Sequence, residues 1–239
     1  MTLRFALFCL VVGLSSSASA QLTWDPEDRE ATAVDWTIGI GGLLVALQIS
    51  AGLDTPDPRW SGMGPLDRIA DGMRLAEEDD RLRAGRASDI LGLLALAPSF
   101  TFSPVFAYTQ DARIGAEVAA INMRSYGVTA LLVALSKHVI RRSRPIAGGS
   151  SSNRSFVSGH TAFAFTGAAL TCVNHRHLEI FGGVIDPLAC ASTTALAVVT
   201  GILRVVAGRH HLSDVLAGAL VGLLSGWLVP ALATYGFGT

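Results

Sequence analysis

Charge is scarce in this sequence. Of the 239 residues, 15% are Asp, Glu, Lys or Arg and 50% are hydrophobic, whereas a soluble domain carries roughly 25% charged residues. The formal net charge is −1, which excludes binding to nucleic acid through bulk positive charge, so no nucleic-acid partner is expected. The composition also excludes a disordered chain. It favours a membrane protein or an unusually apolar helical bundle.

Lysine and cysteine are rarer still. Lys137 is the only lysine, while the other 17 basic residues are Arg. A compact ammonium at one position indicates a role that a guanidinium cannot fill, although a lysine at a helix end can also simply extend its charge towards water. The three cysteines are Cys9, Cys172 and Cys190. An exported chain that loses Cys9 keeps a pair that can form one disulfide.

Metal and nucleotide motifs are missing from the sequence. It has no cluster of Cys, His and Asp with zinc spacing, and no Gly-rich loop before a lysine. His175 and His177 resemble half of a metal site, but nothing completes it, so we expect no metal and no cofactor. The alternating pattern of a β-strand and internal repeats are also absent.

The N-terminus has the three parts of a secretory signal peptide over residues 1–20. Met1–Arg4 is a short positive start, Phe5–Leu14 is an apolar run, and Ala18–Ala20 is a small-residue cleavage site. The alternative is an uncleaved membrane anchor.

Two further regions follow, an N-terminal helix with a charged loop at 21–85 and a core bundle at 86–235. Periodicity predicts an all-α fold of about six apolar helices, embedded in a membrane, with the active site at one end. The apolar segments are Ala33–Leu53, Ser88–Tyr108, Gly115–Ile140, Ser158–Val173, Ala189–Ala207 and Leu212–Thr234. An amphipathic helix is predicted near Pro65–Ala84. Pro98 and Pro104 should kink or break the second apolar segment, and Asn174–His177 should end the fourth.

Polar residues of the C-terminal half gather in three groups, each at a helix end. The groups are Lys137–Pro145, Ser155–His160 and Arg204–Asp214. Lys137, Arg144 and Arg204 are fixed cations suited to phosphate oxygens. Ser158 and Gly159 stand where a helix begins, and the unpaired backbone N–H groups there can receive an anion.

Two histidines and an aspartate complete the chemistry. His160 and His210 can supply a proton donor and a nucleophile near neutral pH. Asp214 follows His210 by four residues, so its carboxylate can hold one ring nitrogen and leave the other free to attack. His211, three residues before Asp214, has a spacing that also permits contact. Cations and histidines without metal ligands predict metal-independent hydrolysis of a phosphate ester through a phospho-histidine.

The pattern K-x6-R-P, then S-G-H, then R-x5-H-x3-D resembles the type 2 phosphatidic acid phosphatase and vanadium haloperoxidase superfamily. The motifs span residues 137–214. The phosphate-binding residues that the resemblance implies are Lys137, Arg144, Ser158, Gly159 and Arg204. It also implies that His160 is the general acid, that His210 is the nucleophile, and that Asp214 orients His210.

Two positions depart from the family pattern. Val157 stands where the second motif usually has Pro, and Leu203 stands where the third usually has Ser. Neither supplies indispensable chemistry, but both alter the pocket wall and therefore the choice of substrate. The R-x5-H spacing selects His210 over His211. The other arginines near the motifs are interpreted as surface charges or lipid-headgroup contacts, and they are Arg141, Arg142, Arg154 and Arg209.

The sequence therefore predicts a phosphoric ester hydrolase that acts on a phosphate monoester or diphosphate, with a phosphorylated lipid and the membrane as its partners. A soluble periplasmic acid phosphatase of broad specificity is the alternative within the fold. A vanadium haloperoxidase or a non-catalytic membrane protein fits less well.

The expected location is a bacterial-type cell envelope with the site on the periplasmic side, as the resemblance implies. Counted from a cleaved start, the motif loop would instead lie inside if Ala33–Leu53, Ser88–Tyr108 and Gly115–Ile140 all cross the membrane. A re-entrant second segment, a first segment on the surface, or a wholly periplasmic bundle would restore an outward site.

A disulfide is predicted at the end of the bundle opposite the site. Cys172 follows His160 by about 18 Å of helix, and Cys190 precedes Arg204 by about 21 Å. Since His160 and Arg204 must meet at one phosphate, antiparallel helices bring both cysteines to a similar depth. The alternative is two buried thiols.

Overall fold

The computed structural model describes residues 22, 24, 31–51, 57–146 and 153–236 and consists of packed helices. They are α2 (Ala33–Ala51), α3 (Pro65–Asp71), α4 (Glu78–Ala97), α5 (Ser103–Gln110), α6 (Ala112–Ile140), α7 (Gly159–Leu178), α8 (Ile185–Val206) and α9 (Leu212–Pro230). Two π-helical turns, η1 (Pro98–Phe102) and η3 (Ala231–Tyr235), continue α4 and α9. No strand occurs within these ranges, which confirms the all-α prediction. The predicted signal peptide lies outside them.

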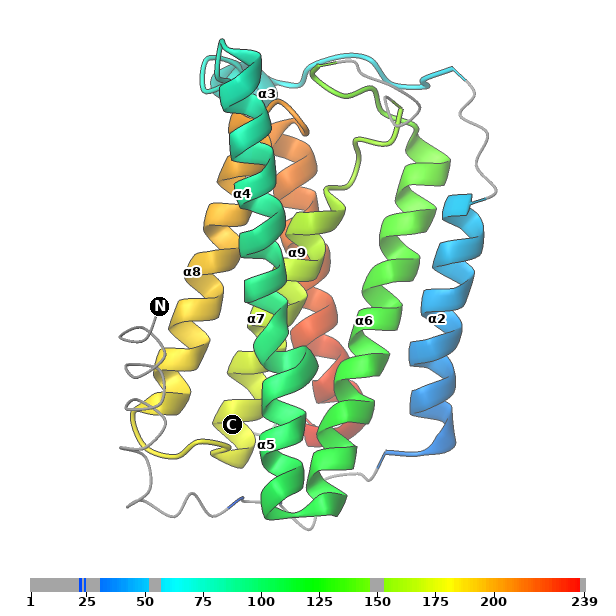
Figure 1. The fold of residues 1–239 in the computed structure, drawn as a ribbon. Helices are drawn as coiled ribbons and strands as arrows, with labels where there is room; N and C mark the ends of the chain where they lie inside the picture. Colours follow the sequence, from blue (N-terminus) through cyan, green and yellow to red (C-terminus); the bar gives the residue numbers. More distant parts are fainter. Residues whose placement is uncertain (1–21, 23, 25–30, 52–56, 147–152, 237–239) are drawn as a thin grey trace.

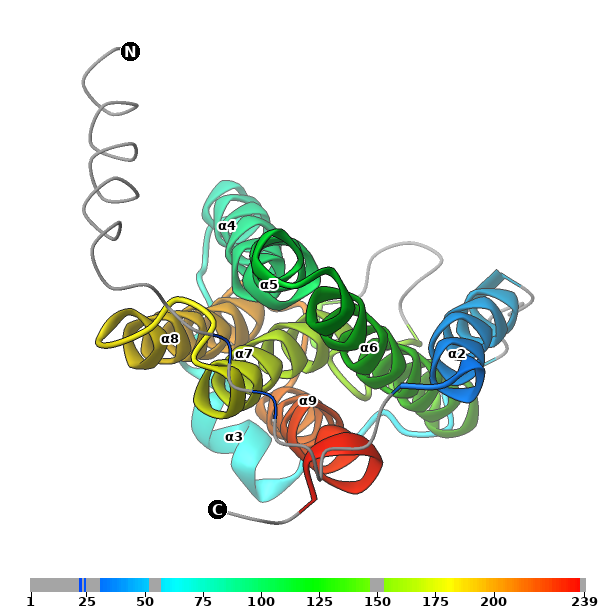
Figure 2. The same ribbon diagram turned by 90° about the horizontal axis from the view of Figure 1, so that it is seen from below.

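Helix α7 forms the centre of the bundle. It packs against α4, α6, α8 and α9, while α2 lies outermost against α6 (Figure 2). The chain passes along the bundle in alternating directions, so that α3 and the loops before α7 and α9 lie at the same end (Figure 1). All three polar motifs therefore meet at this end, as predicted.

Glycines bring α9 close to α7. A Cβ on Gly218, Gly222 or Gly226 would lie 2.5, 2.3 or 2.7 Å from a backbone carbonyl oxygen of the facing helix, so any larger residue would push the helices apart. At the same contact the Ser158 N–H donates to the Asp214 carbonyl over 3.0 Å. This close packing joins the second motif to the third.

The predicted helix Pro65–Ala84 is wrong, because the structure divides it into α3 and the first part of α4. Gly72 ends α3, and the Leu75 N–H donates to the Val206 carbonyl over 3.1 Å. The turn between the two helices is thus fixed by a bond to the distant end of α8. A local pattern carries no information about such a partner.

The predicted interruption of Ser88–Tyr108 takes the form of a π turn. Pro98 opens η1 and Pro104 occupies the first turn of α5. A π turn widens the helix where a proline removes its backbone donor, so the helix continues without a loop.

The predicted break at Asn174–His177 is also wrong, since α7 continues to Leu178. Asn174 Nδ2 donates to Asn122 Oδ1 over 2.8 Å. His175 Nδ1 lies 2.5 Å from Asp186 Oδ1, and its Nε2 lies 2.8 Å from Ser103 Oγ. Buried partners therefore satisfy these polar groups inside the helix. His175 belongs to this network and not to a metal site.

The far half of the bundle also contains the predicted disulfide. Cys172 of α7 and Cys190 of α8 are bonded, with their Cα atoms 4.5 Å apart. The pair lies nearer the α7–α8 turn than the motif end. The disulfide prediction is confirmed.

Five helical segments are long and apolar enough to cross a membrane, namely Ala33–Ala51, Glu78–Gln110, Ala112–Ile140, Ile185–Val206 and Leu212–Tyr235. Large apolar side chains are exposed on their outer faces, among them Leu47, Leu93, Leu132, Ile202 and Leu220. In water such a surface would cost a large amount of free energy, whereas in lipid it is the normal exterior. The protein is a membrane protein.

Candidate active site

Five of the residues predicted for the site come from five separate parts of the chain. Lys137 lies in the last turn of α6, His160 in the first turn of α7, and Arg204 in the last turn of α8. Arg144 and His210 lie in the loops that follow α6 and α8. The positive charges of Lys137, Arg144 and Arg204 all act on both His160 and His210. The structure thus brings three cations and two histidines together.

His210 is held by a backbone carbonyl. Its Nδ1 lies 2.8 Å from the carbonyl oxygen of Ser155, whereas the nearer carboxylate oxygen of Asp214 is 3.9 Å away. A carbonyl only accepts, so Nδ1 carries the proton and Nε2 keeps its lone pair. Asp214 instead accepts from Ser155 Oγ over 2.6 Å. It therefore supports the His210 ring through Ser155, to which the motif pattern assigned no role.

The electrostatic surroundings keep His210 neutral. Burial, together with the cations Arg144, Lys137 and Arg204, lowers the pKa of His210 well below its ordinary value, against a small opposing effect of the Ser155 carbonyl. A neutral imidazole with an unprotonated Nε2 is the form that can attack phosphorus. Its environment suits His210 to the role of nucleophile.

Asp89 is a second residue that the motifs did not reveal. It projects from α4, and its Oδ1 lies 2.6 Å from Arg204 Nη2 and 3.1 Å from His160 Nε2. Its side chain is 51% exposed, so it can move. Partial burial and the charge of Arg204 lower the pKa of His160 to about 4, and the negative charge of Asp89 opposes that shift. The carboxylate thus favours the protonated form that a general acid needs.

Gly159 makes room for the single lysine. A Cβ at this position would lie 3.3 Å from Lys137 Nζ, so a side chain there would crowd the ammonium group. Ser158 occupies the N-cap position of α7, and its hydroxyl lies 2.8 Å from Thr161 Oγ1. The ammonium of Lys137 therefore lies next to the N-terminus of α7, whose backbone N–H groups favour an anion.

Arg144 and Arg204 have unused donors. The Nε atoms of both are buried and have no hydrogen-bond partner within the described residues. Burial and the neighbouring cations Arg209 and Arg154 lower the pKa of Arg144, against the opposing charge of Asp214. Buried cations that repel one another and retain open donors form a site that an anion would stabilise.

The two adjacent histidines face different surroundings. The charges that act on His210 are the cations of the predicted phosphate site, whereas those that act on His211 are Arg142, Asp214 and Asp67. The backbone N–H of His211 donates to Asp214 Oδ2 over 2.9 Å, which caps α9. This arrangement agrees with the choice of His210 from the motif spacing.

The interpretation of Arg142 as a surface charge is wrong. Its side chain is fully buried and forms ion pairs with Asp67 and Asp214.

Within the described residues, no three side chains of His, Cys, Asp or Glu form a group that could hold a metal ion.

Comparison with known proteins adds to this geometry. Residues 119–236 match the model of the PAP2 superfamily. The chain belongs to the PAP2 superfamily. The matched region contains all eight predicted site residues and most of the helices around them. Asp67 and Asp89 lie outside it, in the part of the chain that precedes the PAP2 match.

Two relatives illustrate the extent of the similarity. Over 97 residues the chain is 42% identical to a lipid A 1-phosphatase of Porphyromonas gingivalis, which covers 41% of this chain and 20% of that protein. The chain thus spans about a fifth of the length of that relative. A solved structure, the first transmembrane PAP2 type phosphatidylglycerolphosphate phosphatase from Bacillus subtilis, is 22% identical with a TM-score of 0.44, covering 97% of this chain and 96% of that one.

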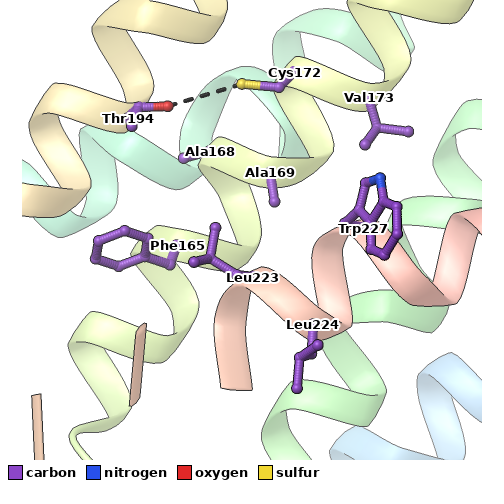
Figure 3. Close-up of a pocket in the computed structure, with 9 residues that line it drawn as sticks. All are labelled: Phe165, Ala168, Ala169, Cys172, Val173, Thr194, Leu223, Leu224 and Trp227. Atoms are coloured by element: carbon purple, nitrogen blue, oxygen red, sulfur yellow. Dashed lines mark hydrogen bonds between the residues drawn. The ribbon is translucent and has the colours of Figure 1, made fainter. Parts of the chain in front are cut away.

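An apolar pocket of about 420 Å³ lies on the side of the PAP2 bundle, between α8 and α9 with α7 behind (Figure 3). Its lining includes Phe165, Thr194, Leu223 and Trp227 and contains none of the predicted site residues. It therefore belongs to the apolar body of the bundle rather than to the cluster of cations.

Proposed function

We propose that this protein hydrolyses a phosphate monoester or diphosphate group of a lipid through a phospho-histidine on His210. The observation that carries the proposal is the state of His210. Its Nδ1 is bound to the Ser155 carbonyl, its Nε2 is left to attack, and three cations surround it.

The first step transfers the phosphoryl group to the enzyme. The Nε2 lone pair forms a bond to phosphorus while the bond from phosphorus to the leaving oxygen breaks. Lys137, Arg144 and Arg204 balance the charge on the three remaining phosphate oxygens. His160 gives its proton to the leaving oxygen, so that an alcohol or a phosphate departs in place of an unprotonated anion.

The second step returns the enzyme to its starting state. A water molecule attacks phosphorus, the P–N bond breaks, and His160 takes the proton of the water. Inorganic phosphate then leaves. Since the pKa of His160 is about 4, His160 depends on the negative charge of the bound phosphate to hold a proton at neutral pH.

A lipid substrate is supported by the surroundings of the site. The cations lie at the end of a bundle whose helices are long enough to cross a membrane. The headgroup phosphate of a lipid can therefore reach them while the lipid stays in the bilayer. The relative from Porphyromonas gingivalis acts, by its name, on lipid A. Phosphatidate, a prenyl diphosphate and a lipid A phosphate are the substrates to compare.

Phosphate release from these three lipids and from p-nitrophenyl phosphate tests the proposal. The purified wild type should release phosphate in EDTA, be inhibited by vanadate, and form an acid-labile phosphoenzyme that His210→Ala lacks. Activity that disappears in EDTA and returns with magnesium or zinc would contradict the metal-independent mechanism. Hydrolysis of the soluble ester alone would contradict the lipid assignment.

We propose that the protein is exported by its N-terminal signal and that the site opens on the periplasmic side of the membrane. Single cysteines introduced at Asp79, near the site end, and at Glu179, at the opposite end, test this orientation. A membrane-impermeant maleimide applied to intact cells with a permeable outer membrane should label the first position. Labelling only of the second would place the site in the cytoplasm.

A further inference from the structure

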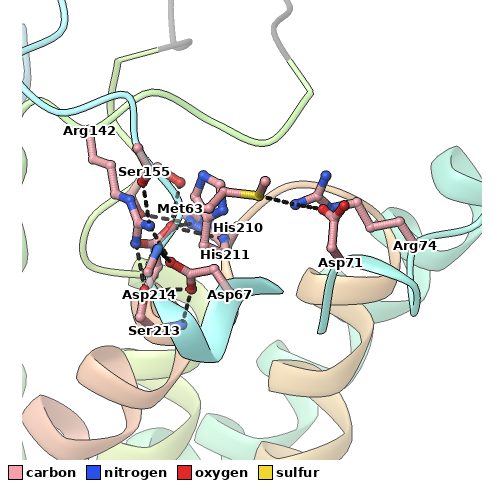
Figure 4. A network of polar contacts seen from close by, with 12 residues as sticks. Met63, Asp67, Asp71, Arg74, Arg142, Ser155, His210, His211, Ser213 and Asp214 are labelled. Atoms are coloured by element: carbon pink, nitrogen blue, oxygen red, sulfur yellow. Dashed lines mark hydrogen bonds and ion pairs between the residues drawn. The ribbon is translucent and has the colours of Figure 1, made fainter. Parts of the chain in front are cut away.

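One buried arginine joins two carboxylates from distant parts of the chain. Arg142 Nη2 lies 2.5 Å from Asp67 Oδ2, and Arg142 Nη1 lies 2.5 Å from Asp214 Oδ1 (Figure 4). All three side chains have no exposed surface. We call this group the Arg142 clamp. It connects the loop after α6 with α3 and with the start of α9.

Hydrogen bonds complete the clamp. Asp67 Oδ1 accepts from the N–H and the hydroxyl of Ser213 over 2.9 and 2.7 Å, and Asp67 Oδ2 accepts from the Gly64 N–H over 2.9 Å. Burial alone would raise the pKa of Asp67, but the hydrogen bonds from Ser213, Gly64 and Arg142 outweigh it and hold that pKa well below its usual range. Both carboxylates of the clamp are thus matched by donors, as buried charges require.

The extended segment before α3 covers the arginine. The guanidinium of Arg142 lies 3.7 Å from the centroid of the Trp60 ring, and its Nη2 donates to the Gly62 carbonyl over 3.2 Å. The Ser143 N–H donates to the Trp60 carbonyl over 2.9 Å. We call residues 59–71 the N-terminal strap. The strap is bound to the first motif loop through its backbone and its side chains.

The clamp leads directly to the nucleophile. Asp214, held by Arg142 through one oxygen, accepts from Ser155 Oγ through the other. The Ser155 N–H donates to the Arg142 carbonyl over 3.0 Å, and the Ser155 carbonyl accepts from His210 Nδ1 over 2.8 Å. Both the side chain and the backbone of Arg142 therefore support the residue that fixes the His210 ring.

We propose that Arg142 and Asp67 are positioning residues that, through Asp214 and Ser155, hold the His210 ring in the orientation for attack. This inference rests on the function proposed above, in which His210 is the nucleophile. Within the described residues, the hydrogen bonds of Arg142 and Asp67 run to each other and to partners other than the three phosphate cations. We therefore expect both to act on the rate of attack and not on binding. The strap that carries Asp67 precedes the PAP2 match. The upstream part of this chain thus completes a site whose reacting groups all lie downstream.

Arg142→Lys and Asp67→Asn in the full-length protein test the proposal. A lysine cannot bind two carboxylates through a planar guanidinium, and an asparagine removes the negative charge that pairs with Arg142. The matched controls are Arg124→Lys and Asp35→Asn, which alter the ion pair between α6 and α2 in the opposite half of the bundle. All variants are purified in one detergent and assayed with phosphatidate and p-nitrophenyl phosphate.

We expect kcat to fall about 100-fold in both clamp variants, the typical effect of a small displacement of a reacting group. The KM for p-nitrophenyl phosphate and the inhibition constant of vanadate should stay near those of the wild type, because Lys137, Arg144 and Arg204 are intact. The single-turnover rate of phosphoenzyme formation should fall by the same factor as kcat. The control variants should keep the wild-type kcat.

A brace that only stabilises the fold would give another result. The clamp variants would then lose melting temperature while the kcat per vanadate-titrated site of the folded protein stayed at the wild-type value, and this would overturn the proposal. An equal loss of kcat in the controls would overturn it too. A wild type that forms no phosphoenzyme and hydrolyses no phosphate ester would instead refute the proposed function, so the two failures are distinguishable.

Discussion

Asp89 forms an ion pair with Arg204, with 2.6 Å between Oδ1 and Nη2. Asp89 is half exposed and Arg204 is buried, so the carboxylate approaches the buried cation from the solvent side. Since Arg204 is proposed to bind phosphate, the carboxylate and the substrate compete for the same guanidinium. The same carboxylate lies 3.1 Å from His160, where it favours a proton.

Asp89→Asn should therefore separate binding from turnover. Vanadate should bind about fivefold more tightly, the equivalent of about 1 kcal/mol for removing one partly screened like charge. Turnover of substrates with poor leaving groups should slow, because the pKa of His160 falls further without Asp89. Inhibition and kcat measurements check both effects, with Asp80→Asn on the same helix as the control. Weaker vanadate binding would show that Asp89 serves mainly to hold Arg204 in place.

His210→Ala should abolish phosphoenzyme formation and lower kcat by roughly 10⁴-fold or more, the loss typical of a removed nucleophile. His211→Ala should keep most of the activity, because the contact of His211 with Asp214 uses its backbone N–H. Trapping with labelled substrate and steady-state kinetics distinguish the two variants. The reverse result would assign the nucleophile to His211.

Activity should persist into acid. The nucleophile His210 must be neutral, and its lowered pKa keeps it so below pH 6.5. His160 must be protonated, and its pKa of about 4 means that its protonated fraction grows as the pH falls towards 4. We expect kcat/KM to rise from pH 8 to pH 5 after correction for the ionisation of the substrate, which has a second pKa of about 6. An acid limb with a midpoint near 6.5 would contradict this order of pKa values.

Lys137→Arg should lower kcat/KM by about 100-fold although the charge is kept, because a larger planar group displaces the phosphate. The space beside Gly159 suits an ammonium, since a Cβ at that position would already lie 3.3 Å from Nζ. Gly159→Ala should cause a smaller loss of the same kind. Kinetics with p-nitrophenyl phosphate measure both, and an active Lys137→Arg would reduce Lys137 to a helix-end charge.

Cys172→Ser should lower stability and leave the chemistry intact. In the chain-entropy picture, closing a loop of this size contributes about 3 kcal/mol, so the melting temperature should fall by about 6–12 °C. The kcat should not change, because neither cysteine contacts a site residue in the described part of the chain. An unchanged melting temperature would indicate that the two sulfurs contribute only packing.

Short-range spacing made the reacting groups predictable. His210 and Asp214 are four residues apart, and Ser158, Gly159 and His160 are consecutive, so local sequence already places them together. Arg142 pairs with Asp67 across 75 positions and Arg204 with Asp89 across 115. Nothing in the sequence near Asp67 distinguishes it from the other acidic residues of the charged segment, so the sequence did not identify it. Asp89 is the single charged residue of the apolar segment Ser88–Tyr108, and an isolated carboxylate of this kind is the signal by which the sequence could have revealed it.

Tertiary contacts also explain the errors in the fold. Asn174 and His175 looked like a helix break because their polar groups need partners, and those partners lie on α5, α6 and the start of α8. Arg142 looked like a surface charge for the same reason. In both cases the pattern correctly marked a polar residue, but only the folded chain supplies the carboxylate or amide that permits its burial.

The disulfide between Cys172 and Cys190 links the compartment in which the protein folds to its orientation in the membrane. A disulfide forms where the thiols meet an oxidising compartment, and these thiols lie in the half of the bundle away from the cations. An oxidised pair in cells, together with labelling at the site end, would mean that both ends had been exported. An oxidised pair with labelling only at the far end would describe a bundle that crosses the membrane with its site inside. The mobility of the protein on a non-reducing gel thus reports, without any added tag, whether the disulfide end was exported, and labelling at the site end then separates the two arrangements.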